Sequence, residues 1–256
     1  MTETKLIDTH CHLDIPLYSN SLDQLIPRCK ELGVKQFIIP GFISSGWERI
    51  FKLSSIYKEI HAAPGLHPCY LPNHSTQDLV RLDTFCKSMN PVAIGEIGMD
   101  FYHGKEREDE QRDLFISQLN IADNHGLPIL LHVRKAHDQV LSILRKRRLT
   151  RGGIVHAFNG SSQQGRQYAE LGFKLGFGGT LTYKRAKKIR KVAQELPLET
   201  IVLETDAPDI PLSNRRDRPN SPEFLPEILK ELSCIRGEDS LKIADTTTKN
   251  AEAVFF

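Results

Sequence analysis

The stretch Leu6-Ile7-Asp8-Thr9-His10-Cys11-His12 places two histidines directly after an apolar pair near the N-terminus. Side chains alternate between the two faces of a β-strand, so in a strand over residues 6–12 Asp8, His10 and His12 share one face. Two imidazoles on one face are able to chelate one metal ion, because histidine is a common ligand of divalent metals. The alternative is a pair of unrelated histidines near a terminus.

The composition is that of an ordinary globular protein. The chain has 256 residues, of which 39% are hydrophobic and 26% charged, and we expect one domain over residues 1–256. The formal net charge of +2 neither demands nor excludes a nucleic-acid partner. Five cysteines without a CxxC pair indicate reduced thiols, and no apolar leader or run of membrane length is present. We expect a cytoplasmic protein with no membrane association and no obligate protein partner.

Short apolar stretches alternate with helical patterns along the whole chain. Nearly continuous apolar runs at 129–131 and 201–203 are typical of parallel strands that helices cover. Eight such alternations in about 250 residues predict a (β/α)8 TIM barrel. An open doubly wound sheet is the alternative, but it would carry a glycine-rich phosphate loop after the first strand, where this chain has histidines. The predicted strands are 6–12, 36–40, 61–66, 92–97, 129–132, 153–156, 174–177 and 201–206.

Metal-capable side chains occur at the ends of several predicted strands. The active site of a (β/α)8 barrel lies at the carboxyl ends of its strands, so these side chains are expected to meet there. Six ligands are too many for one catalytic ion with an open position, but they suit two divalent ions that share a carboxylate. The candidate ligands are His10, His12, Glu96, His132, His156 and Asp206.

Strand position predicts how these ligands divide between two ions. We expect the histidines of the first strand to hold one ion together with Asp206, and His132 and His156 to hold the other. Glu96, on a strand between the two groups, is the expected bridge. The alternatives are a Glu96 paired with a nearby lysine or arginine and histidines satisfied in the core. A ligand set of nitrogen and oxygen accepts Mg, Mn or Zn.

Three further residues are candidates for substrate binding. His67 ends the third strand, and its alternative is a packing role in the loop. Arg134 follows the fifth strand and has the planar fork that suits a phosphate, although it is equally a solvated arginine at a helix start. Glu204 is expected to bind substrate or orient a ligand histidine, with a structural ion pair as the alternative. Asp100 and Tyr102 are weaker candidates.

Two basic groups follow the seventh and eighth predicted strands, on the same side as the metal ligands. These groups are suited to contact with an anionic polymer backbone that enters the site. The alternative is that they are simply solvated side chains. Their members are Lys184, Arg185, Lys187 and Lys188 in the first group, and Arg215, Arg216 and Arg218 in the second.

The chain resembles the TatD-like metal-dependent deoxyribonucleases, a branch of the amidohydrolase-type barrels, and within them the YjjV-like bacterial members. The resemblance runs from residue 7 to about residue 212. It implies an amidohydrolase-like barrel, the same six metal ligands and 3′–5′ exonuclease activity. Departures at Val133, Ala157 and Asn159 leave the substrate preference open. The matching segments are 7–12, Gly65-Leu66-His67-Pro68, Gly95-Glu96-Ile97-Gly98-Met99-Asp100, 155–161, 178–183 and Leu203-Glu204-Thr205-Asp206-Ala207-Pro208-Asp209.

We therefore expect a hydrolase that cleaves phosphodiester bonds in DNA with a hydroxide activated by two divalent metals. Asp206 is expected to hold the hydroxide and accept its proton, and Glu96 to act in catalysis as the shared carboxylate. The alternative is a dinuclear hydrolase of a small-molecule ester, amide or phosphoester, because one fold serves many chemistries. A third reading is a non-enzymatic binding protein with a relic of the site.

Overall fold

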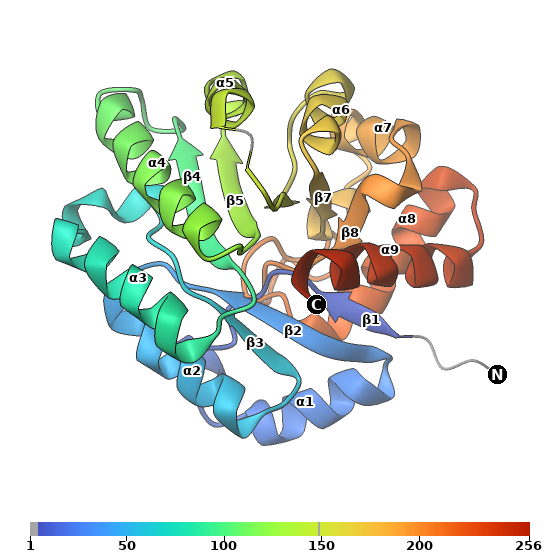
Figure 1. The fold of residues 1–256 in the computed structure, drawn as a ribbon. Helices are drawn as coiled ribbons and strands as arrows, with labels where there is room; N and C mark the ends of the chain where they lie inside the picture. Colours follow the sequence, from blue (N-terminus) through green and yellow to red (C-terminus); the bar gives the residue numbers. More distant parts are fainter. Residues whose placement is uncertain (1–4, 148) are drawn as a thin grey trace.

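The computed structural model describes residues 5–147 and 149–256, so residues 1–4 of the predicted domain and Arg148 lie outside it. Parallel strands form a ring with helices around it (Figure 1). The strands are β1 (Leu6–Asp8), β2 (Val34–Pro40), β3 (Ile60–Ala63), β4 (Ile94–Asp100), β5 (Ile129–Arg134), β6 (Gly153–Val155), β7 (Phe173–Phe177) and β8 (Ile201–Leu203). The α-helices are α1 (Leu22–Glu31), α2 (Trp47–Ile56), α3 (Thr76–Met89), α4 (Glu108–Asn124), α5 (His137–Arg147), α6 (Ser162–Glu170), α7 (Lys187–Glu195), α8 (Leu225–Arg236) and α9 (Ser240–Phe255).

The strands form two parallel sheets, β1-β2-β3 and β4-β5-β6-β7-β8, that meet at two seams. At the β1–β8 seam the Thr9 amide donates to the Leu203 carbonyl at 3.1 Å, and a bridge pairs Cys11 with Ala207. At the β3–β4 seam the Gly95 amide donates to the Pro64 carbonyl at 3.0 Å. These contacts close the ring, and the predicted (β/α)8 barrel is confirmed.

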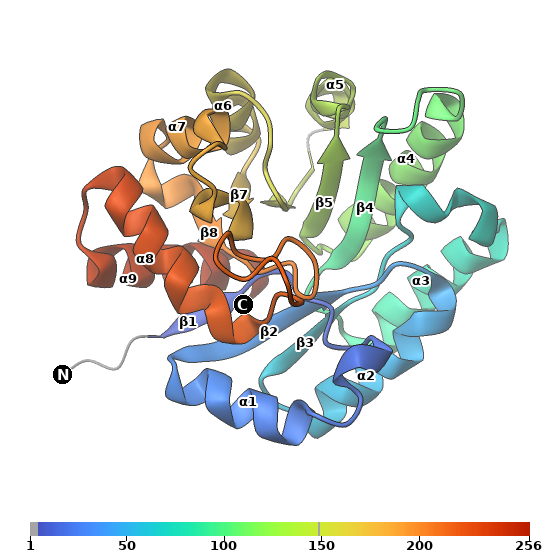
Figure 2. The same cartoon turned by 180° about the vertical axis from the view of Figure 1, so that it is seen from behind.

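Apolar side chains fill the barrel interior. Ile38, Leu130 and Val202 come from separate strands and belong to one buried cluster, which α9 completes with Phe255. Helix α9 lies at the end of the barrel that faces the viewer in Figure 1, and the loop after β8 lies at the other end, which faces the viewer in Figure 2. The loop after β8, and with it the carboxyl end of that strand, therefore lies at the end of the barrel opposite α9.

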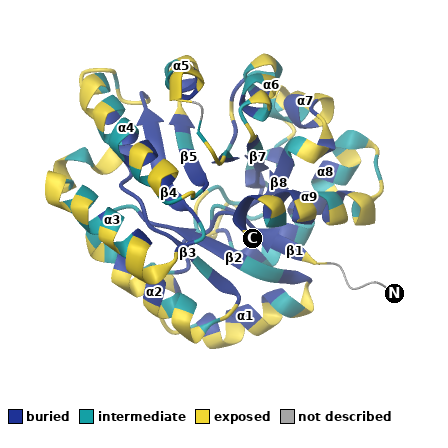
Figure 3. Cartoon of the chain, in the orientation of Figure 1, coloured by how far each residue is buried: buried dark blue, intermediate teal, exposed yellow. Residues whose placement is uncertain are grey.

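The helices cover the outer faces of the strands. The apolar residues that repeat at helical spacing along α4, Phe115, Leu119 and Ala122, are all buried. Figure 3 shows buried strands and helices that are exposed on their outer sides. Among the described residues, no helix is both long enough and apolar enough to cross a membrane.

Three predicted strands end at least three residues earlier in the structure than the sequence suggested. Strand β1 stops at Asp8, β3 at Ala63 and β8 at Leu203, so the predicted ends at 12, 66 and 206 are wrong. The backbone leaves the regular ladder there, and Asp206 adopts a left-handed conformation with φ of 57°. Strands β4 and β5 are instead longer than predicted, because they stay paired as far as Asp100 and Arg134. Part of the site therefore lies on irregular backbone.

The face assigned to the first strand also needs correction. Ile7 points into the barrel interior, and His10, three residues further along, contacts the central carboxylate Glu96. Strict alternation would place Ile7 and His10 on opposite faces, so the alternation is interrupted after Asp8. Asp8 does not share the face of His10. Its carboxylate accepts hydrogen bonds from the Thr205 amide at 2.9 Å and the Thr205 hydroxyl at 2.5 Å.

Candidate metal centre

Glu96 lies at the centre of the site, among histidines from three other strand ends. Its Oε1 is 2.7 Å from His132 Nδ1 and 3.1 Å from His156 Nε2, and its Oε2 is 3.2 Å from His10 Nε2. For Glu96 to reach these histidines, the backbone of β4 has to lie close to that of β5. A Cβ on Gly98 would lie 2.0 Å from the His132 carbonyl oxygen, and the φ of Gly98 is 145°. A glycine is therefore required at position 98, two residues after Glu96.

A second carboxylate, Asp206, faces the two histidines that follow β1. Its Oδ1 is 3.5 Å from His12 Nε2 and 3.6 Å from His10 Nε2. The side chain of Asp206 is 14% exposed, whereas that of Glu96 is 3% exposed. The structure thus brings together the first predicted ligand group. Of the two carboxylates in the cluster, Asp206 is more exposed than Glu96.

His67 lies inside this cluster rather than beside it. Its Nε2 is 3.4 Å from Glu96 Oε1 and 3.2 Å from His132 Nδ1. Its Nδ1 accepts a hydrogen bond from the Cys69 amide at 3.1 Å, at the start of the 3-10 helix Pro68–Asn73. Sequence position had left His67 out of the ligand count, because nothing in the chain order shows how far the loop after β3 reaches inward. Its predicted contact with substrate stays a prediction.

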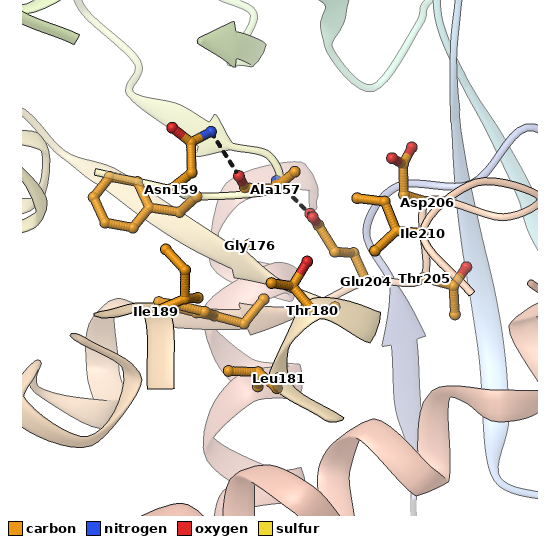
Figure 4. Close-up of a pocket in the computed structure, with 13 residues that line it drawn as sticks. Ala157, Asn159, Gly176, Thr180, Leu181, Ile189, Glu204, Thr205, Asp206 and Ile210 are labelled. Atoms are coloured by element: carbon orange, nitrogen blue, oxygen red, sulfur yellow. Dashed lines mark hydrogen bonds between the residues drawn. The ribbon is translucent and has the colours of Figure 1, made fainter. Parts of the chain in front are cut away.

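Two further carboxylates contact the histidines from behind. Asp100 Oδ2 is 2.9 Å from His132 Nε2, and Glu204 Oε1 is 3.5 Å from His156 Nδ1. Glu204 also accepts a hydrogen bond of 2.6 Å from the Ala157 amide (Figure 4). Such partners fix the tautomer and orientation of a ligand imidazole. The geometry favours the orienting role for Glu204 and gives the same role to Asp100, which the sequence offered only as a weaker candidate for substrate binding.

The buried charges of the cluster compensate one another. Burial raises the pKa of Glu96, but His156, His67 and His10 outweigh it and hold this pKa well below its usual range. Burial lowers the pKa of His156, but the carboxylates of Glu96 and Asp206 outweigh it and hold this pKa well above its usual range. Without another cation, the carboxylates are ionised and His156 carries a proton. A divalent ion is able to take the place of that positive charge.

The donors of the cluster fit divalent metal ions. Both ring nitrogens of His10 are buried without a hydrogen-bond partner. Ligand atoms of His10, Glu96 and His156 lie within 4.8 Å of one another, as do those of His10, His12 and Asp206. Bonds of about 2.0–2.2 Å from one ion to each ligand suit such spacings. The two groups share His10 and so form one continuous cluster of candidate ligands.

The predicted basic residues lie around the cluster and not within it. Arg134 is exposed, and its guanidinium stacks on the Tyr102 ring at 3.5 Å. From the loops after β7 and β8, Arg185 and Arg216 both lie over the Tyr183 ring, at 5.5 Å and 4.9 Å. Three guanidinium groups on two aromatic rings therefore lie at the end of β5 and in the loops that follow β4, β7 and β8.

A small cavity adjoins the cluster on the side of β7 and β8. Its volume is about 40 Å³, and Ala157, Thr180, Glu204, Asp206 and Ile210 are among the residues that line it (Figure 4). That volume holds a few water molecules. It is too small for a nucleotide, so a substrate of that size has to approach from the open end of the barrel.

The family of TatD related DNases matches residues 7–256 of the chain. The chain belongs to this family. The metal-dependent hydrolase YjjV of Escherichia coli K12, described as uncharacterized, is 38% identical over 253 residues, which cover 98% of each chain. The crystal structure of this TatD homologue superposes with a TM-score of 0.95 at 37% identity and 98% coverage of each chain. The resemblance seen in the sequence is confirmed, and this TatD-family protein is a metal-dependent hydrolase.

More distant relatives place this TatD-family chain in a wider context. A protein of Erwinia tasmaniensis named 3'-5' ssDNA/RNA exonuclease TatD is 28% identical over 257 residues, covering 98% of this chain and 99% of its own. An amidohydrolase of Bifidobacterium longum subsp. infantis shares 14% identity at a TM-score of 0.60, with 98% of each chain covered. This second likeness concerns the fold alone and agrees with the predicted amidohydrolase-like barrel.

Proposed function

We propose that this TatD-family hydrolase cleaves phosphodiester bonds in DNA, from the 3′ end, at a centre of two divalent metal ions. The observation that carries the proposal is the position of Glu96, whose two oxygens face different histidines. A carboxylate between two groups of nitrogen donors suits an ion on each side. Sites for two metal ions are typical of enzymes that displace an oxygen at phosphorus.

In this proposal His10, His12 and Asp206 would hold one ion, His132 and His156 would hold the other, and Glu96 would serve both groups. When bound, Mg, Mn or Zn ions lower the pKa of water and neutralise charge on phosphoryl oxygens. The chain itself keeps the donors in place. Glu204 and Asp100 orient the two histidines of the second group from behind.

Asp206 is the residue best placed to accept a proton from the attacking water. In the metal-free protein burial raises its pKa, but His156, His12 and His10 outweigh it and lower this pKa, so the carboxylate is ionised and available as a metal ligand. Its side chain is more exposed than that of Glu96 and so reaches an incoming substrate. Glu96 is buried and holds the donors around it.

DNA suits the border of the site. Arg134 provides a planar fork for a phosphate, and its stacking on Tyr102 keeps the fork in place. The guanidinium groups of Arg185 and Arg216 lie over the Tyr183 ring and provide further phosphate donors. The name of the Erwinia relative supports the 3′–5′ direction.

A second candidate is hydrolysis of a small-molecule ester, amide or phosphoester. The small cavity beside Asp206 and Glu204 favours it, because a compact substituent would fill this space. Salt separates the two candidates. Affinity for DNA falls steeply with salt as counterions are released, whereas affinity for a small neutral substrate does not.

The deciding experiment uses single-stranded DNA labelled at its 5′ end, with Mg, Mn or Zn added in turn and EDTA as control. We expect stepwise shortening from the 3′ end that EDTA abolishes. His132→Ala should abolish cleavage and keep the circular dichroism spectrum of the parent. No cleavage by protein shown to hold metal would overturn the DNase proposal in favour of the small-molecule hydrolase.

A further inference from the structure

We propose that Cys69, Asp100 and His132 form an additional, thiolate-containing site for a soft divalent cation such as Zn²⁺ or Cd²⁺. The site lies on the outer side of His132, away from Glu96. Its three residues come from the loop after β3, from the end of β4 and from β5. It shares His132 with the donors that surround Glu96 and differs from them by its thiol.

The donors of this outer site are already close together. Asp100 Oδ2 is 3.4 Å from Cys69 Sγ and 2.9 Å from His132 Nε2. His67, Cys69 and His132 also each offer a ligand atom within 4.8 Å of those of the other two. A tetrahedral zinc ion with bonds of about 2.0–2.3 Å separates neighbouring ligands by roughly 3–4 Å. One sulfur, one nitrogen and one oxygen therefore lie near the corners that such an ion needs.

The thiol gives this site a different preference from the central cluster. Sulfur ligands favour zinc and its softer relatives over magnesium and manganese. The cysteine nearest to the central cluster in sequence, Cys11, is buried with its Sγ directed to the Ile38 carbonyl, 3.9 Å away. Cys69 is exposed, so it meets metal ions from solvent.

A cavity leads to the outer site. Its volume is about 240 Å³, and its lining includes Cys69, Asp100, His103 and Glu106. The cavity is large enough for a hydrated ion, and it carries additional nitrogen and oxygen donors. An ion is therefore able to reach Cys69 without passing through the central cluster.

Binding would exchange a proton for a metal. In the metal-free protein the Cys69 thiol donates a weak hydrogen bond to Asp100. When the ion binds, the S–H bond breaks, the proton leaves to solvent and a sulfur–metal bond forms. No electron is transferred. Coordination deprotonates a thiol even where its surroundings otherwise keep it protonated.

Occupation of the outer site has a consequence for the proposed centre. His132 turns Nδ1 to Glu96 and Nε2 to Asp100. A neutral imidazole offers a lone pair on only one of its nitrogens, so an ion at Nε2 competes with an ion at Nδ1. Excess zinc or cadmium should therefore inhibit the enzyme through Cys69. This consequence rests on the proposed function, whereas the existence of the outer site does not.

Cobalt spectroscopy tests the outer site without any substrate. Metal-free protein is titrated with Co²⁺, because thiolate-bound cobalt has an intense charge-transfer absorption in the near ultraviolet that nitrogen and oxygen ligands do not produce. The variants are Cys69→Ser and, as the matched control, Cys234→Ser, which removes the exposed cysteine of α8. We expect the thiolate band in the parent and in Cys234→Ser and its loss in Cys69→Ser. Absence of the band in the parent, or its persistence in Cys69→Ser, would overturn the proposal.

A cadmium titration of activity tests the regulatory consequence. Cys69→Ser is expected to keep its basal activity and to need about tenfold more Cd²⁺, or still more, for half inhibition, in line with loss of one contact at a metal site. Cys234→Ser should behave as the parent. Equal sensitivity of all three proteins would refute inhibition through Cys69. The spectroscopic result stands whether or not the protein cleaves DNA, so the two proposals fail separately.

Discussion

Glu96 Oε1 lies 2.7 Å from His132 Nδ1, and this contact joins the fourth strand of the barrel to the fifth at the centre of the site. The same carboxylate faces His10 through its other oxygen, at 3.2 Å. One side chain therefore connects donors from opposite parts of the ring. Its removal affects every proposed ligand group at once.

Glu96→Gln should reduce both metal content and activity. The amide keeps the size of the side chain but removes the charge that two ions would share, so we expect bound metal to fall and kcat to drop by about a hundredfold or more. Metal analysis after gel filtration, together with DNA cleavage, measures both effects. Full metal content with full activity would show that Glu96 is not the bridge.

Glu204→Gln tests the orienting role of a carboxylate that contacts a histidine from behind. The amide oxygen can still accept from the Ala157 amide, but the charge facing His156 is lost. We expect metal affinity to weaken by about 10- to 100-fold while the fold persists. Competition with a chromogenic chelator measures the affinity. An unchanged affinity with a raised KM would instead favour the predicted contact of Glu204 with substrate.

Arg134→Ala should weaken DNA binding more than catalysis. Loss of one phosphate contact raises KM and lowers the slope of log affinity against log salt by about one. The matched control is Lys249→Ala, which removes one positive charge from the exposed surface of α9, at the opposite end of the barrel. An equal effect of the two substitutions would indicate general charge and not a contact by Arg134.

Metal binding should release protons. His156 is protonated in the metal-free protein, because the carboxylates of Glu96 and Asp206 outweigh burial and raise its pKa. A histidine has to lose this proton to bind a metal, so the apparent affinity should fall as pH falls below this raised pKa. Calorimetry in buffers of different ionisation enthalpy counts the protons. A heat independent of the buffer at pH 7 would contradict the expected release.

Gly98→Ala should disturb the site through the backbone. The added Cβ would lie 2.0 Å from the His132 carbonyl oxygen, at a φ of 145° that side chains disfavour. We expect a loss of about 1–3 kcal/mol in the free energy of unfolding, with weakened metal binding. Gly46→Ala is the control, since its Cβ meets nothing within 4 Å, and it should change stability by less than about 1 kcal/mol. Denaturant titration of both variants in EDTA measures the difference.

The periodicity of the sequence predicted the architecture because strand and helix patterns are local. The apolar residues that repeat at helical spacing along α4 are buried, and Gly33, Gly126 and Gly172, each shortly before a strand, all have positive φ. The strand ends were predicted less well. Whether β8 stops at Leu203 or continues to Asp206 depends on pairing with β1 and β7, which are remote in the chain.

The sequence by itself determined the barrel and the residue types of the site, because period and chemical character are local properties of the chain. The convergence of the six candidate ligands also followed, since a barrel gathers the carboxyl ends of its strands. Only the tertiary structure decided which side chains contact one another. It placed His67 beside Glu96, Asp100 behind His132 and Cys69 beside Asp100. Such contacts depend on how far each loop reaches across the barrel mouth, and the packing of distant segments sets that distance.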